Sequence, residues 1–225
     1  NNIKLLIFEH GVLTRFYKSF KTSEKTAHIY SSEENYNKRE PLASRVFKSH
    51  SPLYNIYQSI DNLRKKNTAT QKEILIADTY NIRHCLLDLA HLLEKNNSVK
   101  IRLHPGTELN IGKFRSNINK VSAMARAKLV ITGISGFSLE SAFSNIPTII
   151  LFSRDDVWGN QTLKVYDGLP HVQIVELKDF FKTPDKFVSL TADGGDKLLE
   201  FQQRTGYFVD NQSMQDLNNF ITNDI

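Results

Sequence analysis

The 225-residue sequence has a single cysteine and no long apolar run, and each scarcity excludes a class of protein. One cysteine, Cys85, cannot build a disulfide framework or a cysteine-based zinc site, and it fits a reducing compartment. No apolar run reaches the roughly 18 residues that a membrane-spanning helix needs, and no signal-peptide pattern opens the chain. We therefore expect a cytoplasmic protein.

Sequence signatures for several ligands are also missing. Neither a Walker A motif nor G-x-G-x-x-G occurs, and no zinc-finger, RNA-binding-sheet or basic-zipper signature points to nucleic acid. The formal net charge is +5, but lysine and arginine are scattered along the chain. Scattered charge is typical of a solvated basic surface. The alternative is attraction to a polyanion, such as an acidic glycan or an anionic membrane surface.

What is present is an ordinary globular composition, with 40% hydrophobic and 24% charged residues. This length and composition allow one large or two small domains with a real core. The sequence enters the apolar run "IKLLIF" without a starting methionine, so we expect it to be a fragment of a longer protein.

Strands and helices alternate from residue 72 onward. Apolar runs of strand length lie at 72–78, 99–105, 128–133, 146–152 and 171–177. Helical patterns lie between and after them, at 81–97, 122–127, 136–145, 157–168, 196–208 and 213–221. Before residue 72 we expect strands at 3–11 and 27–32, a helix at 51–66 and a linker at 67–71. This alternation favours a parallel sheet with helices on both faces.

The stretch "KIRLHPGTEL" (100–109) has the pattern of a strand that stops at His104-Pro105. A proline cannot donate a ladder hydrogen bond, and it keeps the residue before it extended. Ligands of open α/β sheets bind at the carboxyl edge of the strands, so His104 is a candidate ligand group. Thr132-Gly133 ends the next strand, and we therefore expect His104 to face residues 132–140.

The stretch "ITGISGFSLE" (131–140) is a candidate anion site. Gly133 and Gly136 let the backbone approach a ligand, and the helix start offers N–H groups with a partial positive charge. Ser135 and Ser138 add hydroxyl groups that suit a phosphate, although either serine could simply cap the helix. Glu140, taken to lie in the first helical turn, either complements the helix dipole or hydrogen-bonds a ribose diol.

Three short motifs occur in a fixed order: "EHG" (9–11), "RLHP" (102–105) and "SGFSLE…NIP" (135–147). In this order they resemble the GT-B glycosyltransferases that use cytidine-nucleotide donors, above all the bacterial sialyltransferases and polysialyltransferases. They are also similar to the capsule and teichoic-acid glycerophosphotransferases. The resemblance covers roughly residues 1–11 and 72–177.

The resemblance implies a role for each motif. His104, with Pro105 after it, would contact the donor phosphate and stabilise the departing nucleotide. The donor would also contact Gly133, Ser135, Gly136, Ser138 and Glu140. The sialyltransferase general base is an acid directly before the glycine, and this sequence has His10 there. His10 fits the glycerophosphotransferases better and is a sound base near neutral pH, while Glu9 would orient it or act as the base itself.

Both motif histidines also have a structural interpretation, as strand-end residues satisfied by the backbone. The other five histidines are His28, His50, His84, His91 and His171, and they belong to no partnered motif. We interpret these five as packing or surface residues. Asp155-Asp156 resembles a metal-binding acidic pair, but two acids in this position are more typical of the start of a loop. The resemblance implies no metal and no cofactor other than the donor substrate.

The implied fold class is α/β and GT-B-like, with a Rossmann-type parallel-sheet donor domain and part of a second, N-terminal domain. Residues 1–70 would be the remnant of the acceptor domain and the interdomain segment. Residues 71–195 would bind the nucleotide sugar, and residues 196–225 would form closing helices.

The implied function is transfer of a sugar, in the first instance sialic acid, from a CMP-activated donor to a bacterial surface glycan such as capsule or lipooligosaccharide. Three alternatives stay open: a CDP-glycerol-type polyol-phosphate transferase, a UDP-sugar epimerase of the same fold, and a nucleotide-binding or regulatory module without catalysis. The partners would be a nucleotide-sugar donor and a glycan acceptor. The basic surface leaves open an acidic acceptor and peripheral association with the inner face of the membrane.

Overall fold

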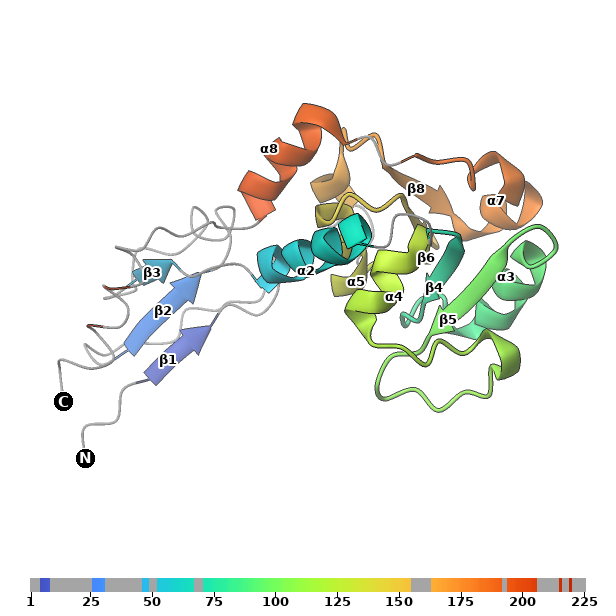
Figure 1. Ribbon diagram of the computed structural model, residues 1–225, viewed down its shortest axis with the longest axis horizontal. Helices are drawn as coiled ribbons and strands as arrows, with labels where there is room; N and C mark the ends of the chain where they lie inside the picture. Colours follow the sequence, from blue (N-terminus) through green and yellow to red (C-terminus); the bar gives the residue numbers. More distant parts are fainter. Residues whose placement is uncertain are drawn as a thin grey trace. The chain divides into compact units, whose positions relative to one another are not determined.

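The computed structural model describes residues 5–8, 26–30, 46–48, 52–66, 71–154, 163–191 and 194–205, together with Gln215 and Asn219 (Figure 1). The chain divides into two compact units, one of residues 1–55 with 199–225 and one of residues 56–198. The assignment of 1–70 to an acceptor domain, 71–195 to a donor domain and 196–225 to closing helices remains a prediction. None of the helices in the described ranges has the length and apolar character that crossing a membrane requires.

The first unit contains a small parallel sheet. Its strands are β1 (Leu5–Phe8), β2 (Thr26–Tyr30) and β3 (Val46–Lys48), in the order β1-β2-β3. The apolar patterns at 3–11 and 27–32 predicted the first two strands, and nothing predicted the third. Glu9 and His10 follow β1 in the sequence but lie outside the described residues.

The second unit is built on a five-stranded sheet in which every pairing is parallel. The strands are β4 (Glu73–Ala77), β5 (Ser98–Arg102), β6 (Ala127–Thr132), β7 (Thr148–Phe152) and β8 (Val172–Glu176), in the order β5-β4-β6-β7-β8. All five correspond to the apolar runs in the sequence, so the prediction of a parallel α/β sheet is confirmed.

One strand ends earlier than the sequence predicted. β5 stops at Arg102, before His104-Pro105, because its partner β4 ends at the paired residue Ala77. The N–H of His104 then donates to the side chain of Asp78 rather than to a strand. The proline follows the strand end and does not cause it.

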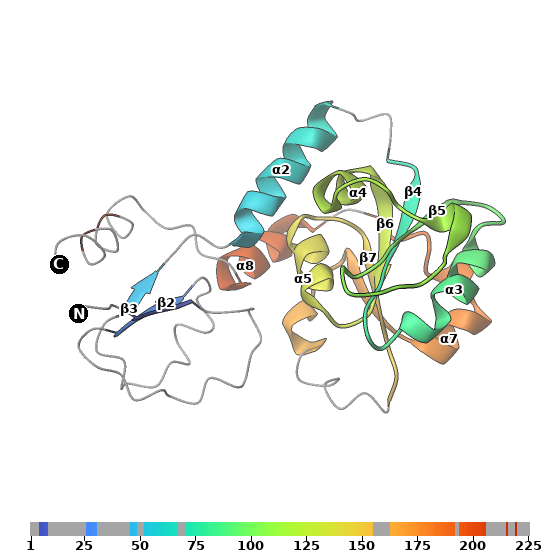
Figure 2. The ribbon, with the colours of Figure 1, turned by 90° about the horizontal axis from the view of Figure 1, so that it is seen from below.

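Helices cover both faces of this sheet. They are α2 (Pro52–Lys66), α3 (Leu86–Leu93), α4 (Lys120–Arg126), α5 (Gly136–Phe143) and α7 (Leu177–Lys182). A further helix, α8 (Gly195–Thr205), begins in the second unit and continues in the first. Figure 2 shows α3 and α7 on one side of the strands and α4 and α5 on the other. α7 had no counterpart in the predicted pattern. In the described part of 157–168 the predicted helix is a single 3-10 turn, Lys164–Tyr166.

The strand side chains alternate between two cores. On β4, Ile74 and Ile76 are fully buried in the core beneath α3, while Leu75 packs with Ile60 of α2 and Met124 of α4. Successive side chains of a strand point to opposite faces, so a strand buried on both faces is apolar throughout. This accounts for the continuous apolar runs of β4 and β7, whereas the edge strands β5 and β8 carry the polar residues Lys100 and Gln173 in their interior.

Candidate functional site

The strand order places a switch point at β4. The chain passes from β4 to β5 on one side and then returns to β6 on the other side of β4. Ligands of doubly wound sheets bind outside the carboxyl ends of the strands at such a reversal. The register pairs Ala77 with both Arg102 and Thr132, so the segments after these three residues start at one edge of the sheet.

This order corrects one expectation. His104 and Gly133 were predicted to follow neighbouring strands, but β4 lies between β5 and β6. The segment 78–83, which follows β4, therefore separates the two motifs at the sheet edge. No motif predicted a role for this segment.

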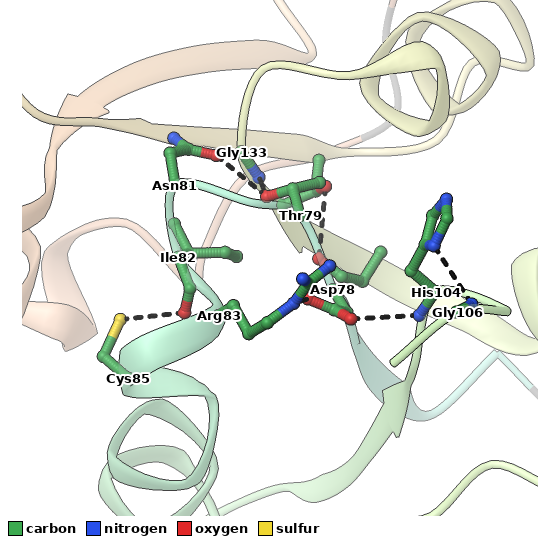
Figure 3. A network of polar contacts seen from close by, with 11 residues as sticks. Asp78, Thr79, Asn81, Ile82, Arg83, Cys85, His104, Gly106 and Gly133 are labelled. Carbon is green, nitrogen blue, oxygen red and sulfur yellow. Dashed lines mark hydrogen bonds and ion pairs between the residues drawn. The ribbon is translucent and has the colours of Figure 1, made fainter. Parts of the chain in front are cut away.

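Segment 78–83 connects the ends of three other strands (Figure 3). The Thr79 hydroxyl accepts the Gly133 N–H (3.1 Å) after β6 and donates to Asn81 Oδ1 (2.9 Å). The Asn81 amide in turn donates to the Leu151 carbonyl of β7 (3.0 Å), and Asp78 Oδ2 accepts the His104 N–H (3.1 Å) after β5. The carboxyl edge is thus tied together by side chains of a single loop.

Asp78 is the charged centre of this loop. Its side chain is fully buried, and Oδ1 accepts from Arg83 Nε at 3.0 Å. Burial alone would raise the pKa of Asp78, but the Thr107 hydroxyl beside it, the Arg83 guanidinium and the His104 N–H together hold that pKa below its usual value. The carboxylate is therefore charged at neutral pH and fixes the backbone at His104.

His104 presents one ring nitrogen outward. The residue is exposed, and its Nδ1 accepts the Gly106 N–H at 3.3 Å. A neutral imidazole that accepts at Nδ1 carries its hydrogen on Nε2, which Figure 3 shows pointing away from Asp78. The Thr107 N–H donates to the His104 carbonyl at 2.8 Å, so Pro105 occupies the second position of a β-turn, where proline is favoured. His104 is a fixed hydrogen-bond donor at the sheet edge.

Gly133 must be a glycine for steric reasons. A Cβ at this position would collide with Asn81 Oδ1 and Thr79 Oγ1. At Gly136, by contrast, a Cβ would meet nothing within 4 Å, and the residue is exposed. Gly133 is thus needed for the packing of the loop, while Gly136 leaves the backbone at the start of α5 accessible to solvent.

The two serines of the motif hydrogen-bond to each other, and only Ser138 is buried. Ser135 is the N-cap of α5, and Ser135 and Ser138 form a reciprocal capping box. The buried Ser138 hydroxyl donates to the Ser135 carbonyl (2.6 Å) and accepts the Ser135 N–H (3.1 Å), and it lies 2.9 Å from the Tyr166 hydroxyl. With Tyr166 as the donor, Ser138 makes the three hydrogen bonds that a hydroxyl can make. Burial raises the pKa of Tyr166, which keeps that donor protonated.

Backbone donors remain at the start of α5. Among the described residues, no hydrogen bond reaches the N–H groups of Gly136 and Phe137. These two groups carry the partial positive charge of the helix start. Glu140 lies in the second turn of α5, not in the first as expected, and its Oε1 accepts from Lys120 of α4 at 2.7 Å. Glu140 therefore forms an ion pair that links α5 to α4.

Other predicted residues lie apart from this edge or outside the described ranges. Glu9, His10 and the Asp155-Asp156 pair are outside them. His91 is on the surface beside Glu94, and His171 is buried with Nε2 2.9 Å from the Ala142 carbonyl. Within the described ranges, no group of three or more His, Cys, Asp or Glu side chains could hold a metal ion.

The sequence did carry a signal for the missed segment. "ADTYNIR" (77–83) places Asp, Thr and Asn directly after a buried strand, as the other two motifs place polar residues after theirs. This pattern alone does not predict a role, because the importance of the segment depends on β4 lying between β5 and β6, and a local pattern does not encode strand order.

Comparison with known proteins supplies structural neighbours only. No protein-family model matches the sequence, and the search of curated proteins found no match. Among solved structures, the wall teichoic acid polymerase TagF aligns over 99% of this chain and 69% of its own, with 16% identity and a TM-score of 0.55. Its H444N variant aligns over 88% of this chain with 18% identity and a TM-score of 0.51. MurG from Acinetobacter baumannii aligns over 97% of this chain and 67% of its own, with 11% identity and a TM-score of 0.53.

These neighbours define the architecture. At such identities a structural likeness speaks for the fold and not for the reaction. The chain spans 57% of the length of the TagF H444N variant. Its parallel five-stranded sheet, flanking helices and switch point are those of a Rossmann-type domain, and the chain has a GT-B fold.

Proposed function

We propose that this chain is the donor-binding part of a GT-B glycosyltransferase, with the nucleotide phosphate bound at the switch point beside β4. The substrate class is a nucleotide-activated sugar, and the proposed donor is CMP-linked, with sialic acid as the first candidate. The acceptor is a bacterial surface glycan. The scattered basic residues suit an acidic acceptor and peripheral contact with an anionic membrane.

The observation that carries this proposal is the fixed donor at His104. Asp78 holds its backbone, the Gly106 N–H holds Nδ1, and Nε2–H is left to point outward. The free N–H groups of Gly136 and Phe137 start a helix at the same sheet edge. Two kinds of hydrogen-bond donor at one edge suit an oxyanion, and phosphate is the oxyanion common to every candidate donor.

This geometry revises the roles within the serine motif. Ser138 has no hydrogen-bonding capacity left, so we propose that it shapes the loop while the backbone of 136–137 binds the phosphate. Ser135 is half-buried, and its hydroxyl accepts from the Ser138 N–H at 3.4 Å. Ser135 therefore remains a candidate phosphate contact. Glu140 could reach a ribose only through movement of a side chain that Lys120 now holds.

In the proposed reaction, the acceptor hydroxyl loses its proton to His10 or Glu9 and attacks the anomeric carbon of the donor. The bond between that carbon and the phosphate oxygen breaks, and CMP leaves with the negative charge on its phosphate. His104 Nε2–H and the N–H groups at the start of α5 stabilise that charge. The roles of His10 and Glu9 rest on the resemblance of "EHG".

The second candidate is transfer of a polyol phosphate from a CDP-glycerol-type donor. Two facts favour it: His10 stands where the sialyltransferases have an acid, and one TagF neighbour is a variant soaked with CDPG. Competition between CMP-sialic acid and CDP-glycerol for the same site separates this candidate from the first.

The test is calorimetric titration of the full 225-residue chain with CMP, CDP and UDP. We expect cytidine-selective binding that His104→Ala weakens about 10- to 100-fold, since a hydrogen bond to a charged group contributes about 1.5–3 kcal/mol. His91→Ala is the matched control, because His91 is an exposed histidine on α3 that pairs with Glu94. It should bind like the parent chain.

Each of the other outcomes would favour a different function or overturn the donor site. Preference for UDP would favour a UDP-sugar transferase or the epimerase alternative, which turnover of a UDP-sugar without acceptor would reveal. Absence of binding to all three nucleotides would overturn the donor site. If nucleotide binds but His10→Ala leaves the biological activity intact, the chain is a binding or regulatory module and not an enzyme.

A further inference from the structure

Tyr80 is a large aromatic side chain left in solvent at the switch point. It is 91% exposed, the highest value among the large hydrophobic side chains of the described residues. Tyr166, whose hydroxyl contacts Ser138, is by contrast 2% exposed. Exposure of a single large apolar side chain is common, so exposure alone does not indicate a role for Tyr80. Its location at the sheet edge is the informative feature.

The location is the tip of a fixed turn. The Ile82 N–H donates to the Thr79 carbonyl at 3.2 Å, which makes Tyr80 the second residue of a β-turn over 79–82. Both neighbours of Tyr80 are anchored: Thr79 to Gly133 after β6, and Asn81 to Leu151 of β7. A turn that follows an interior strand and is held on both sides positions its tip residue at small entropic cost.

Tyr80 also lies between the two phosphate-binding elements in the order of the strands. His104 follows β5, Tyr80 follows β4 and Gly133 follows β6. Neighbouring strands lie about 4.8 Å apart, so the three segments span roughly 10 Å of sheet edge. A nucleotide that places its phosphate on this edge must pass its remaining groups over or beside the 79–82 turn.

We propose that the ring of Tyr80 stacks on the nucleobase of the donor, which makes Tyr80 a binding residue of the site. The inference rests on the proposed function and deepens it. CMP-sugar, CDP-glycerol and UDP-sugar donors all carry a pyrimidine nucleobase, and this base is planar and aromatic as the tyrosine ring is. Stacking on an aromatic side chain tolerates different bases, so selectivity for cytosine must come from other contacts.

The experiment compares two ligands that differ only in the base. CMP and ribose 5-phosphate share the ribose and the 5′-phosphate, and each is titrated into the full chain and into Tyr80→Ala. We expect Tyr80→Ala to weaken CMP binding about 5- to 100-fold, the range that base–aromatic stacking gives on alanine substitution. Affinity for ribose 5-phosphate should not change.

Tyr80→Phe is the matched control, because it keeps the ring and removes the hydroxyl. It should bind CMP within about twofold of the parent, whereas Tyr80→Leu, which is apolar without a π face, should behave like alanine. Since Tyr80 is exposed, all three variants should unfold at the parent temperature. Ring-proton NMR shifts of Tyr80 on addition of CMP, absent with ribose 5-phosphate, give a second readout.

The two proposals fail differently. If CMP binds and His104→Ala weakens it but Tyr80→Ala does not, stacking is wrong and the donor site stands. If Tyr80→Ala weakens CMP and ribose 5-phosphate equally, the ring contacts the sugar or supports the loop, and base stacking is again wrong. If the parent chain binds no nucleotide, both proposals are overturned.

Discussion

The two motifs at the carboxyl edge of the sheet use their polar side chains in opposite ways. On the β5 side, His104 is exposed and points one ring nitrogen outward, while its backbone is held by a buried carboxylate. On the β6 side, the hydroxyl of Ser138 is buried and saturated by Ser135 and Tyr166. Similar strand-end motifs thus give a side-chain donor on one side and backbone donors on the other.

This difference assigns distinct consequences to substitutions on the two sides. A change of His104 should affect ligand affinity and leave folding intact, because the ring is in solvent. A change of Ser138, Tyr166 or Gly133 should affect stability first, because these residues hold the loop in shape. The loop 78–83 joins the two sides, and its residues should affect both properties.

Gly133→Ala should have the largest effect. Its Cβ would collide with Asn81 and Thr79, two short side chains anchored by hydrogen bonds, so we expect a loss of about 1–3 kcal/mol of unfolding free energy. Thermal unfolding followed by circular dichroism measures it. Gly136→Ala is the matched control, since its Cβ meets nothing within 4 Å and its stability should be unchanged. Equal stability of the two variants would mean that the loop packs differently.

Asp78→Asn should lower both the stability of the fold and the affinity for CMP. The amide offers an N–H2 group to one of two donors, Arg83 Nε–H or the His104 N–H, and leaves that donor without an acceptor. Because Arg83 is partly exposed, we expect a loss of about 1–2 kcal/mol, with weaker CMP binding through the displaced His104. An unchanged CMP affinity would mean that Asp78 does not position His104 for ligand binding.

The pH dependence of Asp78→Asn gives a sharper signature. The pKa of Asp78 is lower in the folded chain than its usual value near 4, so the carboxylate stabilises the fold above that pH and loses this contribution as pH falls through the folded pKa. The parent chain should therefore lose its stability advantage over Asp78→Asn below about pH 4. A constant difference from pH 7 to pH 3, measured by urea unfolding, would contradict this assignment.

Tyr166→Phe should have the smallest effect. It removes one hydrogen bond to Ser138 and leaves the two bonds between Ser138 and Ser135, so we expect a loss of about 1 kcal/mol. Affinity for CMP should stay within about twofold of the parent. His104→Ala should show the reverse pattern, with parent-like unfolding and weakened CMP binding. If Tyr166→Phe weakened CMP binding clearly and left the unfolding temperature unchanged, Ser138 would have to contact the ligand directly.

Most elements of the second unit could be predicted from local patterns. Each strand buried on both faces is a continuous apolar run, and each main helix has apolar residues at helical spacing. Two predictions were wrong: β5 ends three residues before the end of the predicted run 99–105, and Glu140 lies one turn later in α5 than predicted. Both errors concern boundaries, which depend on where a partner strand ends and where the cap lies.

The candidate site was predicted only at its two ends. His104 and the 133–136 loop carry proline and glycine signals that mark strand ends in any fold. Asp78, Thr79 and Asn81 carry no such signal, and their importance comes from hydrogen bonds to residues 26–70 positions away. Capping by Ser138 was one of two interpretations, and the buried Tyr166 hydroxyl that saturates it could not be foreseen.

The sequence by itself determined the α/β class, the succession of strands and helices and the polar residues at the strand ends, because hydrophobic periodicity and chain-stopping residues act over a few residues. Only the tertiary structure decided that β4 stands between β5 and β6, that segment 78–83 lies at the centre of the candidate site and that the Ser138 hydroxyl is buried. Strand order and side-chain partners depend on contacts between segments far apart in the chain, and no local pattern encodes which segments will meet.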